Sequence, residues 1–343
     1  MTDDLGVRAA GRRARRWVLA LAVALCAAAC LGVALGSVWL GPHALYEALV
    51  HRGESAQATI VWQVRLPRVL LGLAVGAGLG ACGAALQALA RNDLADPHLL
   101  GINSGASCGA ALAILLGFGA GWTEHALQAM AFLGALAAGL LVYTTARAGG
   151  RLTALRLVLA GVAVGYALSA VTSFLIMAVG NTEGTRSVMF WLLGSLGLAQ
   201  WNSPLAVVVA VTAATVAWLT LRARQLDALG IGDATAHAVG YSPQRVRAGL
   251  FVVAAACVGV SVAAAGSIGF VGLVVPHLAR RAVGSVHRHA IPVSALMGAV
   301  LVVCADVVAR TALSPREIPV GVITALVGAP FLWSVIRQGR AGY

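Results

Sequence analysis

The sequence predicts an all-α membrane protein with ten transmembrane helices, and three observations support this prediction. Hydrophobic residues make up 60% of the 343-residue chain and charged residues only 10%, whereas a soluble domain carries roughly 25% charged residues. Ten apolar stretches approach or reach the length that crosses a bilayer. The basic residues are concentrated in alternate connections between these stretches. We therefore expect one polytopic domain over residues 1–343, with no soluble domain and no flexible linker.

The first apolar stretch follows the basic run Arg12-Arg13-Ala14-Arg15-Arg16 and lacks a clear small-residue cleavage site. We therefore expect a retained helix rather than a signal peptide, preceded by a cytoplasmic tail over 1–16. The predicted spans are 17–40, 69–90, 99–118, 126–146, 155–179, 203–221, 246–265, 268–284, 291–311 and 318–338. An even number of spans puts both termini on the same side of the membrane.

The basic residues indicate which side that is. All 24 of them are Arg, and the chain contains no Lys. In the ten-span topology all but six lie on the side of the termini, which the positive-inside rule assigns to the cytoplasm. The high positive charge therefore reflects membrane topology, and we expect lipid contacts and no nucleic-acid partner. The six exceptions are Arg52, Arg65, Arg68, Arg186, Arg310 and Arg316.

A polar turn over residues 91–97 interrupts the apolar, Gly-rich sequence between the second and third spans. Irregular polar backbone at membrane depth is tolerated only where protein or a water-filled path shields it, so the break indicates a transport role. The simpler alternative is a hairpin in which Asp96 and Pro97 form the turn.

Catalysis is not expected. A Walker A loop needs a Lys that reaches the phosphates, and this chain has no Lys. If transport uses ATP, a separate subunit must therefore hydrolyse it. The six Cys lie in apolar helices without the spacing of paired ligands. No cofactor, metal site or catalytic residue is predicted.

Two connecting segments have features of their own. Residues 186–198 are too short to span the membrane and predict an extra helix near the outer face. Residues 227–247 predict one or two short cytoplasmic helices separated by Gly, which suits docking to another protein as well as a plain connection.

Charged side chains also occur within or beside the spans. Asp306 and Arg310 are spaced i, i+4, which favours a structural ion pair, while an acid at this depth is also a candidate proton site. Arg65 and Arg68 flank Pro67 on the outer side. They indicate either snorkelling at the interface or a positive patch for an acidic docking protein.

Seven motifs, in order from about residue 60 to the end of the chain, resemble a single family. This family is the permease subunit of bacterial ABC importers for iron chelates, haem and vitamin B12. The motifs are RLPR (65–68), NDLADPHLLG followed by INSGA (92–106), LVLAGVAVG (157–165), FWLLGSL (190–196), AAAGSIGFVGLVVPHLARR (263–281), ADVVAR (305–310) and EIPVGVITALVGAPFLW (317–333).

The resemblance implies the type II ABC importer permease fold in the bacterial inner membrane. It implies a homodimer with the transport path along the dimer axis, lined by the fifth helix of each copy. Two ATP-binding subunits would dock on the cytoplasmic side, and a periplasmic substrate-binding protein would dock on the outer side.

The resemblance also carries site residues over to this chain. The residues that match the family's positions for docking of the binding protein are Arg65, Arg68 and Arg310. Those that match the cytoplasmic gate are Asn92, Leu94, Thr153 and Ala154. Those that match the ATPase-coupling positions lie within 227–247 and are Asp227, Gly230, Asp233, His237, Gly240, Tyr241 and Arg245. Two departures bear on the gate: Asp93 stands where the family usually has proline, and Thr153-Ala154-Leu155 is more apolar than in the cobalamin member.

The apolar side chains near the fifth helix guide the prediction of the substrate. Tyr166, Phe174 and Met177 are expected to line the path and would tolerate a flat apolar macrocycle, which favours haem, although such a stripe also occurs in ordinary helix packing. The alternatives are import of a ferric siderophore or cobalamin by the same mechanism. A transporter driven by protons through Asp306 is a further alternative.

Overall fold

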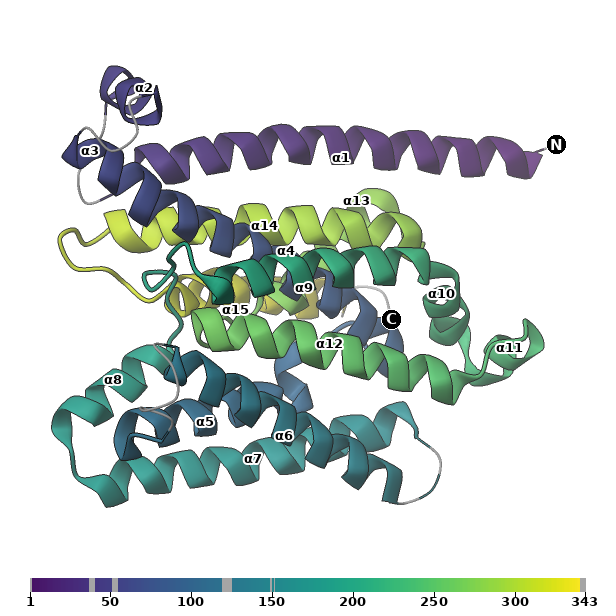
Figure 1. Ribbon diagram of the computed structural model, residues 1–343. Helices are drawn as coiled ribbons and strands as arrows, with labels where there is room; N and C mark the ends of the chain where they lie inside the picture. The colour runs from purple at the N-terminus through teal and green to yellow at the C-terminus, as the bar shows by residue number, and fades with distance from the viewer. Residues whose placement is uncertain are drawn as a thin grey trace.

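The structure is a computed structural model that describes residues 2–36, 41–50, 55–118, 125–148, 150 and 152–339. Among these residues it is all-helical, with the long helices running back and forth along one direction (Figure 1). We call the end that carries α10 and α11 the α10 end, and the opposite end, with α2, α3 and α8, the α8 end. Arg52, which the topology prediction placed outside, is not among the described residues.

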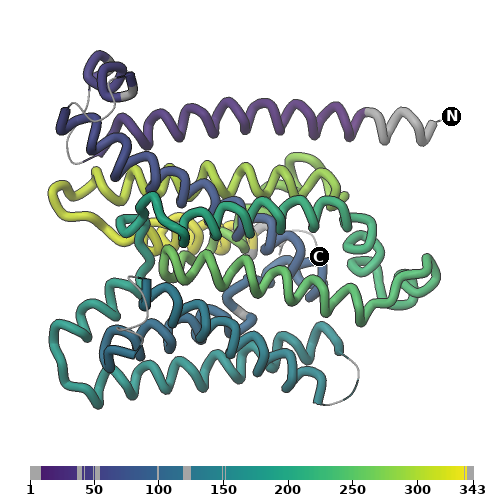
Figure 2. Tube along the Cα trace, viewed as in Figure 1, coloured from purple at the N-terminus to yellow at the C-terminus, as the bar shows by residue number. Residues whose placement is uncertain are grey.

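Each predicted span corresponds to one helix. These helices are α1 (Thr2–Ala34), α4 (Leu66–Ala90), α5 (Ile102–Leu116), α6 (Ala126–Ala148), α7 (Ala154–Val179), α9 (Ser203–Leu221), α12 (Pro243–Ala265), α13 (Val271–Val283), α14 (His287–Thr311) and α15 (Val320–Gly339). The shorter elements are α2 (Pro42–Val50), α3 (Ala56–Thr59), the π-helix η1 (Ile60–Arg65), the 3-10 helix η2 (Pro97–Leu100), α8 (Thr182–Leu192), α10 (Ala223–Ile231) and α11 (Asp233–Ala238). Helix α1 starts and α15 ends toward the α10 end (Figure 1), and Figure 2 shows α1 running beside α14.

Not every predicted span is a complete helix. Within the described residues, seven helices are long and apolar enough to cross a membrane, whereas α5 and the apolar part of α15 are shorter. Helix α13 has 13 residues, against the roughly 20 that a span needs. The predicted helix from 268 is therefore wrong at its start, because residues 266–269 are not helical. The backbone at Gly266 and Phe270 has φ +67°, which an α-helix does not allow.

The two ends of the chain's first span also differ from expectation. Helix α1 begins at Thr2 rather than near residue 17 and ends at Ala34. Ala and Arg are strong helix formers, so the predicted tail continues the helix.

Helix α4 lies at the centre of the bundle. It packs against α9, α12, α13 and α14, and most extensively against α14. The contact is between backbones: a Cβ atom on Gly76 would lie 2.2 Å from the carbonyl oxygen of Gly298, and one on Gly83 would lie 2.0 Å from that of Gly272. Since lipid removes the hydrophobic drive for helices to associate, such close approach of small residues supplies much of the packing energy.

We expect Gly76→Ala to destabilise the protein by about 1–3 kcal/mol, because the added methyl group meets backbone that cannot move aside. Gly139→Ala is the matched control, since a Cβ atom there would meet only Ala255 Cβ, at 3.8 Å. Thermal unfolding in lipid nanodiscs measures the difference, and equal midpoints for the two variants would contradict this account of the packing.

Candidate functional site

The two breaks in the bundle meet each other. The ring of His98, in η2, forms a hydrogen bond of 3.0 Å between its Nε2 atom and the carbonyl oxygen of Ile268. A Cβ atom on Gly272 would lie 2.5 Å from Pro97 Cδ. The His98 ring thus satisfies one backbone carbonyl of the non-helical segment before α13, and Pro97 packs against the start of α13, as irregular structure at membrane depth requires.

The predicted gate residues gather around one cavity of about 390 Å³ at the α10 end. Asn92, Thr153 and Ala154 line it together. Asn92 Oδ1 accepts a hydrogen bond of 2.9 Å from the backbone N–H of Leu94, and Leu94 is 42% exposed beside the cavity-lining turn. Thr153 Oγ1 accepts one of 3.3 Å from Arg156 N and so caps α7. The structure therefore brings the turn and the start of α7 together.

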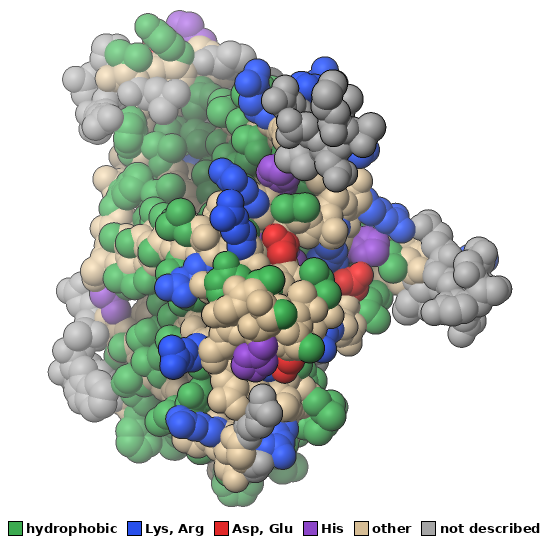
Figure 3. All heavy atoms as spheres, turned by 90° about the vertical axis from the view of Figure 1, so that its right-hand side faces the viewer, with side chains coloured by type: hydrophobic (Ala, Val, Ile, Leu, Met, Phe, Trp, Pro, Cys, Tyr) green, Lys and Arg blue, Asp and Glu red, His purple; other side chains and the backbone are tan. Residues whose placement is uncertain are grey.

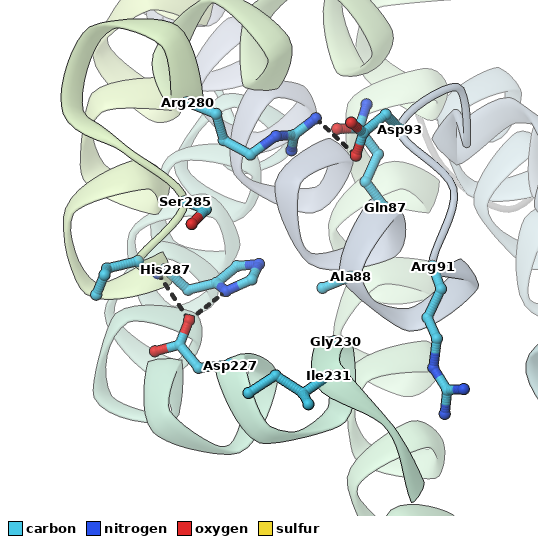
Figure 4. A pocket seen from close by; sticks show the side chains of 11 residues that line it. Gln87, Ala88, Arg91, Asp93, Asp227, Gly230, Ile231, Arg280, Ser285 and His287 are labelled. Carbon is cyan, nitrogen blue, oxygen red and sulfur yellow. Dashed lines mark hydrogen bonds and ion pairs between the residues drawn. The ribbon is translucent and has the colours of Figure 1, made fainter. Parts of the chain in front are cut away.

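Asp93 has a partner that the sequence did not predict. Its carboxylate pairs with Arg280 of α13 at 3.2 Å. The pair borders a second cavity at this end, of about 580 Å³, into which residues of α4, α10 and the α13–α14 connection project (Figure 4). A charged residue is thus accommodated where the family usually has proline, because it joins the turn to α13.

The predicted coupling segment forms the short helices α10 and α11, and two carboxylates anchor it to the bundle. Asp233 pairs with Arg91, which ends α4, and accepts a hydrogen bond of 3.0 Å from Arg247 of α12. The hydrogen bond from Arg247 lowers the pKa of Asp233; partial burial opposes this, and the charges of Arg247 and Arg91 add to it. Arg91 and Arg247 also line the cavity around the predicted gate residues, so one carboxylate connects the predicted coupling segment to that cavity.

Asp227 makes the second anchor. It accepts hydrogen bonds from the backbone N–H of His287, at 3.0 Å, and at 2.6 Å from the ring Nδ1 (Figure 4). Burial raises the pKa of Asp227, but the hydrogen bonds and charge of His287 outweigh it, so that the pKa lies below its ordinary value. These bonds attach α10 to the first turn of α14.

The outer surface of the coupling segment is open. Gly230 has open space around it, and Gly240 has φ +84°, which turns the chain after α11. His237 and Arg245 are exposed. The Tyr241 N–H donates to the carbonyl of Ala236 at 2.9 Å. Figure 3 views the α10 end directly and shows Arg or Lys side chains, which in this chain are all Arg, spread across it. Exposed arginines in the segments that lie toward the α10 end in Figure 1 include Arg147, Arg222, Arg224, Arg245, Arg281 and Arg288.

The three arginines predicted for docking lie together at the α8 end, and all are buried. Arg65 donates to the carbonyls of Val33, at 2.7 Å, and Ala34, at 2.8 Å. Arg310 donates to the Gly32 carbonyl at 2.5 Å. These carbonyls belong to the last turn of α1, where cations satisfy unpaired acceptors and the helix dipole. Two of the three arginines therefore already bind the C-terminal end of α1.

The third, Arg68, is held by two carboxylates. It contacts Asp306 at 2.9 Å and Glu317 at 3.0 Å. The expected Asp306–Arg310 ion pair is also present, at 3.3 Å. Sequence spacing found the pair on one helix but missed the stronger bonds from Arg68. Sequence spacing could not have found these bonds, because Arg68 and Asp306 are 238 residues apart and meet only through the packing of α4 against α14.

Side chains of α7 predicted to line the path face outward. Tyr166 is 77% exposed, Phe174 67% and Met177 85%, and only 11% of the apolar core of α7 is buried. The exposed face also carries Ser169 and Ser173. Polar groups at membrane depth usually face protein or a water-filled cavity, so this face suits a partner or a path better than lipid.

Comparisons with known proteins agree with this architecture. The model of the FecCD transport family matches residues 21–338. The vitamin B12 import system permease protein BtuC of Vibrio cholerae is 42% identical over 305 residues, covering 89% of this chain and 88% of the relative. The protein of the same name from Salmonella typhimurium is 39% identical over 332 residues, covering 96% and 97%.

A solved structure points the same way. A chain described as an inward-facing conformation of a metal-chelate type ABC transporter shares 31% identity with a TM-score of 0.84, covering 94% of this chain and 99% of that one. The matched region contains every predicted gate, coupling, docking and path residue. The chain belongs to the FecCD transport family.

Proposed function

We propose that this chain is the permease subunit of an ATP-driven importer that carries cobalamin across the bacterial inner membrane. The observation that carries the proposal is the link from the coupling segment through Asp233 to Arg91 and Arg247 at the gate cavity. A movement imposed on α10 and α11 from outside the chain would thereby reach the turn that closes the path.

Cobalamin replaces haem as the preferred substrate. The preference for haem rested on Tyr166, Phe174 and Met177, whose exposed apolar surface suits any large macrocycle. The relatives that match almost the whole chain are named as vitamin B12 permeases, which favours the cobalamin alternative. A ferric siderophore remains a further candidate of the same class.

The partners follow from the same proposal. ATP-binding subunits would dock on α10 and α11, where Ile231 is 74% and Val239 57% exposed. A second copy of the chain would cover the exposed face of α7, and a periplasmic substrate-binding protein would dock at the α8 end. Asp306 is a weaker candidate for proton coupling, because two guanidinium groups hold it as in a structural ion cluster.

Uptake into proteoliposomes tests the function. We expect the chain, reconstituted with its ATP-binding subunits and binding protein, to accumulate cobalamin only when ATP is supplied. Haem and a ferric siderophore, offered separately, should be taken up more slowly. Faster uptake of haem than of cobalamin would instead support haem as the substrate. Uptake driven by a proton gradient without the ATP-binding subunits would overturn the proposal.

Asp233→Asn tests the mechanical link. Removing the charge weakens the bonds to Arg91 and Arg247, so we expect ATP hydrolysis to continue while substrate moved per ATP falls about fivefold, equivalent to roughly 1 kcal/mol for partly exposed ion pairs. Gln244→Ala, at an exposed position of the same segment that is not among the predicted coupling residues, is the control and should keep full coupling. Unchanged coupling in Asp233→Asn would remove the link from the mechanism.

The attachment of α11 through Asp233 should weaken only when the solution is acidic enough to protonate that carboxylate. Because the folded state lowers the pKa of Asp233 below its ordinary value of 3.8, the carboxylate contributes stability above that value and loses it as pH falls through the lowered pKa. Amide hydrogen exchange over 233–238, corrected for intrinsic rates, should therefore show equal protection from pH 5 to 8. Loss of protection between pH 6 and 5 would contradict this assignment.

A further inference from the structure

The cavity of about 580 Å³ at the α10 end is bordered by a ring of three side-chain pairs (Figure 4). The pairs are Asp227–His287, Arg280–Asp93 and Arg91–Asp233. All of these residues except Asp233 line the cavity. Three short stretches of backbone join one pair to the next: 91–93 of the polar turn, 280–287 from α13 to α14, and 227–233 of α10 and α11. The ring therefore connects the polar turn to the predicted coupling segment in two directions.

The polar turn is the part of the ring that is held from both sides. Arg91 Nε donates to the carbonyl of Leu229 in α10 at 3.3 Å, and its guanidinium also pairs with Asp233. Two residues later, Asp93 pairs with Arg280 of α13 at 3.2 Å. Figure 4 shows the side chains of Arg91 and Asp93 pointing in different directions. Two charges of opposite sign, close together on one turn, thus attach it to two different parts of the bundle.

Both ends of the turn are fixed on α13 or on the segment before it. Gln87, in the last turn of α4, is 2% exposed, and its Nε2 donates to the carbonyls of Gly272 and Leu273 at 3.4 and 3.2 Å. After the turn, the His98 ring bonds to Ile268. Between these two anchors, residues 92–96 are attached to α13 through Asp93. The position of this middle part therefore depends on the Asp93–Arg280 pair.

The two members of this pair differ in exposure. The Asp93 side chain is 71% exposed and that of Arg280 is 18% exposed. The paired terminal nitrogen of Arg280 has no hydrogen bond to any described group, so Asp93 balances its charge at ion-pair distance. Exposed pairs contribute little stability, whereas a buried guanidinium without an anion is unfavourable. The pair can therefore open at low cost, and the burial of Arg280 favours its closing again.

We propose that the Asp93–Arg280 pair is a second connection between the coupling segment and the polar turn, which runs through the start of α14 and the end of α13. Asp227 attaches α10 to His287, the backbone continues from His287 to Arg280, and Arg280 holds Asp93. The inference rests on the proposed function and makes Asp93 and Arg280 positioning residues for the predicted gate. They act on Leu94, the next residue of the turn.

The two connections have different effects on the turn. While both are intact, a shift of α10 displaces the turn at residue 91 and at residue 93 together, and the cavity inside the ring leaves space for such a shift. Without the Asp93–Arg280 pair, the turn is held at Arg91 alone and can rotate about that point. Leu94 would then no longer follow α10, although the ATP-binding subunits would continue to work. Loss of the pair should therefore lower transport per ATP and spare hydrolysis.

A double-mutant cycle in the complete complex tests the proposal, with cobalamin moved per ATP as the measurement. We expect Asp93→Asn and Arg280→Gln each to lower this ratio about threefold, the effect of a partly exposed ion pair. The double variant should lower it no further, because both changes remove the same interaction. Asp93→Glu keeps the charge and should retain most of the coupling.

Arg288→Gln is the matched control. It removes a positive charge from an exposed position at the start of α14, and it should change the ratio by less than about 1.5-fold, as surface substitutions usually do. An unchanged ratio in folded Asp93→Asn or Arg280→Gln, effects that multiply in the double variant, or an equal loss in Asp93→Glu or Arg288→Gln would each overturn the proposal.

Amide hydrogen exchange over 92–96 in the full chain, in nanodiscs, provides a second measurement that needs no partner. The Leu94 N–H bonds to Asn92 Oδ1 at 2.9 Å, and the Ala95 N–H bonds to the Asn92 carbonyl at 3.0 Å. Asp93→Asn should speed exchange there at least about threefold, because a turn held at one end opens more often.

This measurement keeps the test valid if Arg280→Gln does not fold, since Asp93 lies on an exposed turn. Unchanged exchange in Asp93→Asn would show that the pair does not hold the turn and would overturn the proposal. An unaltered complex that imports no cobalamin when ATP is supplied would instead count against the proposed function.

Discussion

The backbone contact of α4 with α14 and α13 is the constraint on which the rest of the structure depends. Gly76 and Gly298, and Gly83 and Gly272, approach closely: a Cβ atom on Gly76, Gly298 or Gly83 would collide with a carbonyl group across the contact, and one on Gly272 would collide with Pro97. This contact sets the position of both ends of α4. At one end Arg68 reaches Asp306 of α14, and at the other the turn after α4 reaches Arg280 of α13. Both charged regions therefore depend on how α4 packs against its neighbours.

The way in which charges pair within the chain explains how the two ends of the bundle differ. At the α8 end, buried guanidinium groups complete the C-terminus of α1 and hold Asp306, because a buried charge without a partner is costly. At the α10 end, Asp233 and Asp227 are partly exposed and join short helices to the bundle. Exposed pairs contribute little stability, so these connections can change between states of the protein.

Much of the architecture was predictable from local sequence. Apolar length and the distribution of Arg located the ten helices, and the segment 227–247 was expected to form short helices. The predicted start of the span that contains α13 is wrong, which shows the limit of reasoning from local sequence. Residues 266–270 lie in an apolar stretch, and their non-helical backbone is held by the hydrogen bond from His98 to Ile268 and by the close packing of Trp191 and Gly194 against Gly266. Partners distant in sequence decide the conformation there.

The sequence by itself determined that this is a polytopic membrane protein of one family, since hydropathy, Arg asymmetry and motif order are properties of short segments. It also located the polar turn after α4 and the short helices within 227–247. Only the tertiary structure decided the partners of the charges. Arg65 and Arg68 were candidates for an outward basic patch, yet the fold buries them, together with Arg310, against α1, Asp306 and Glu317. Ion pairs between residues hundreds of positions apart depend on which helix faces meet, and no local pattern records that.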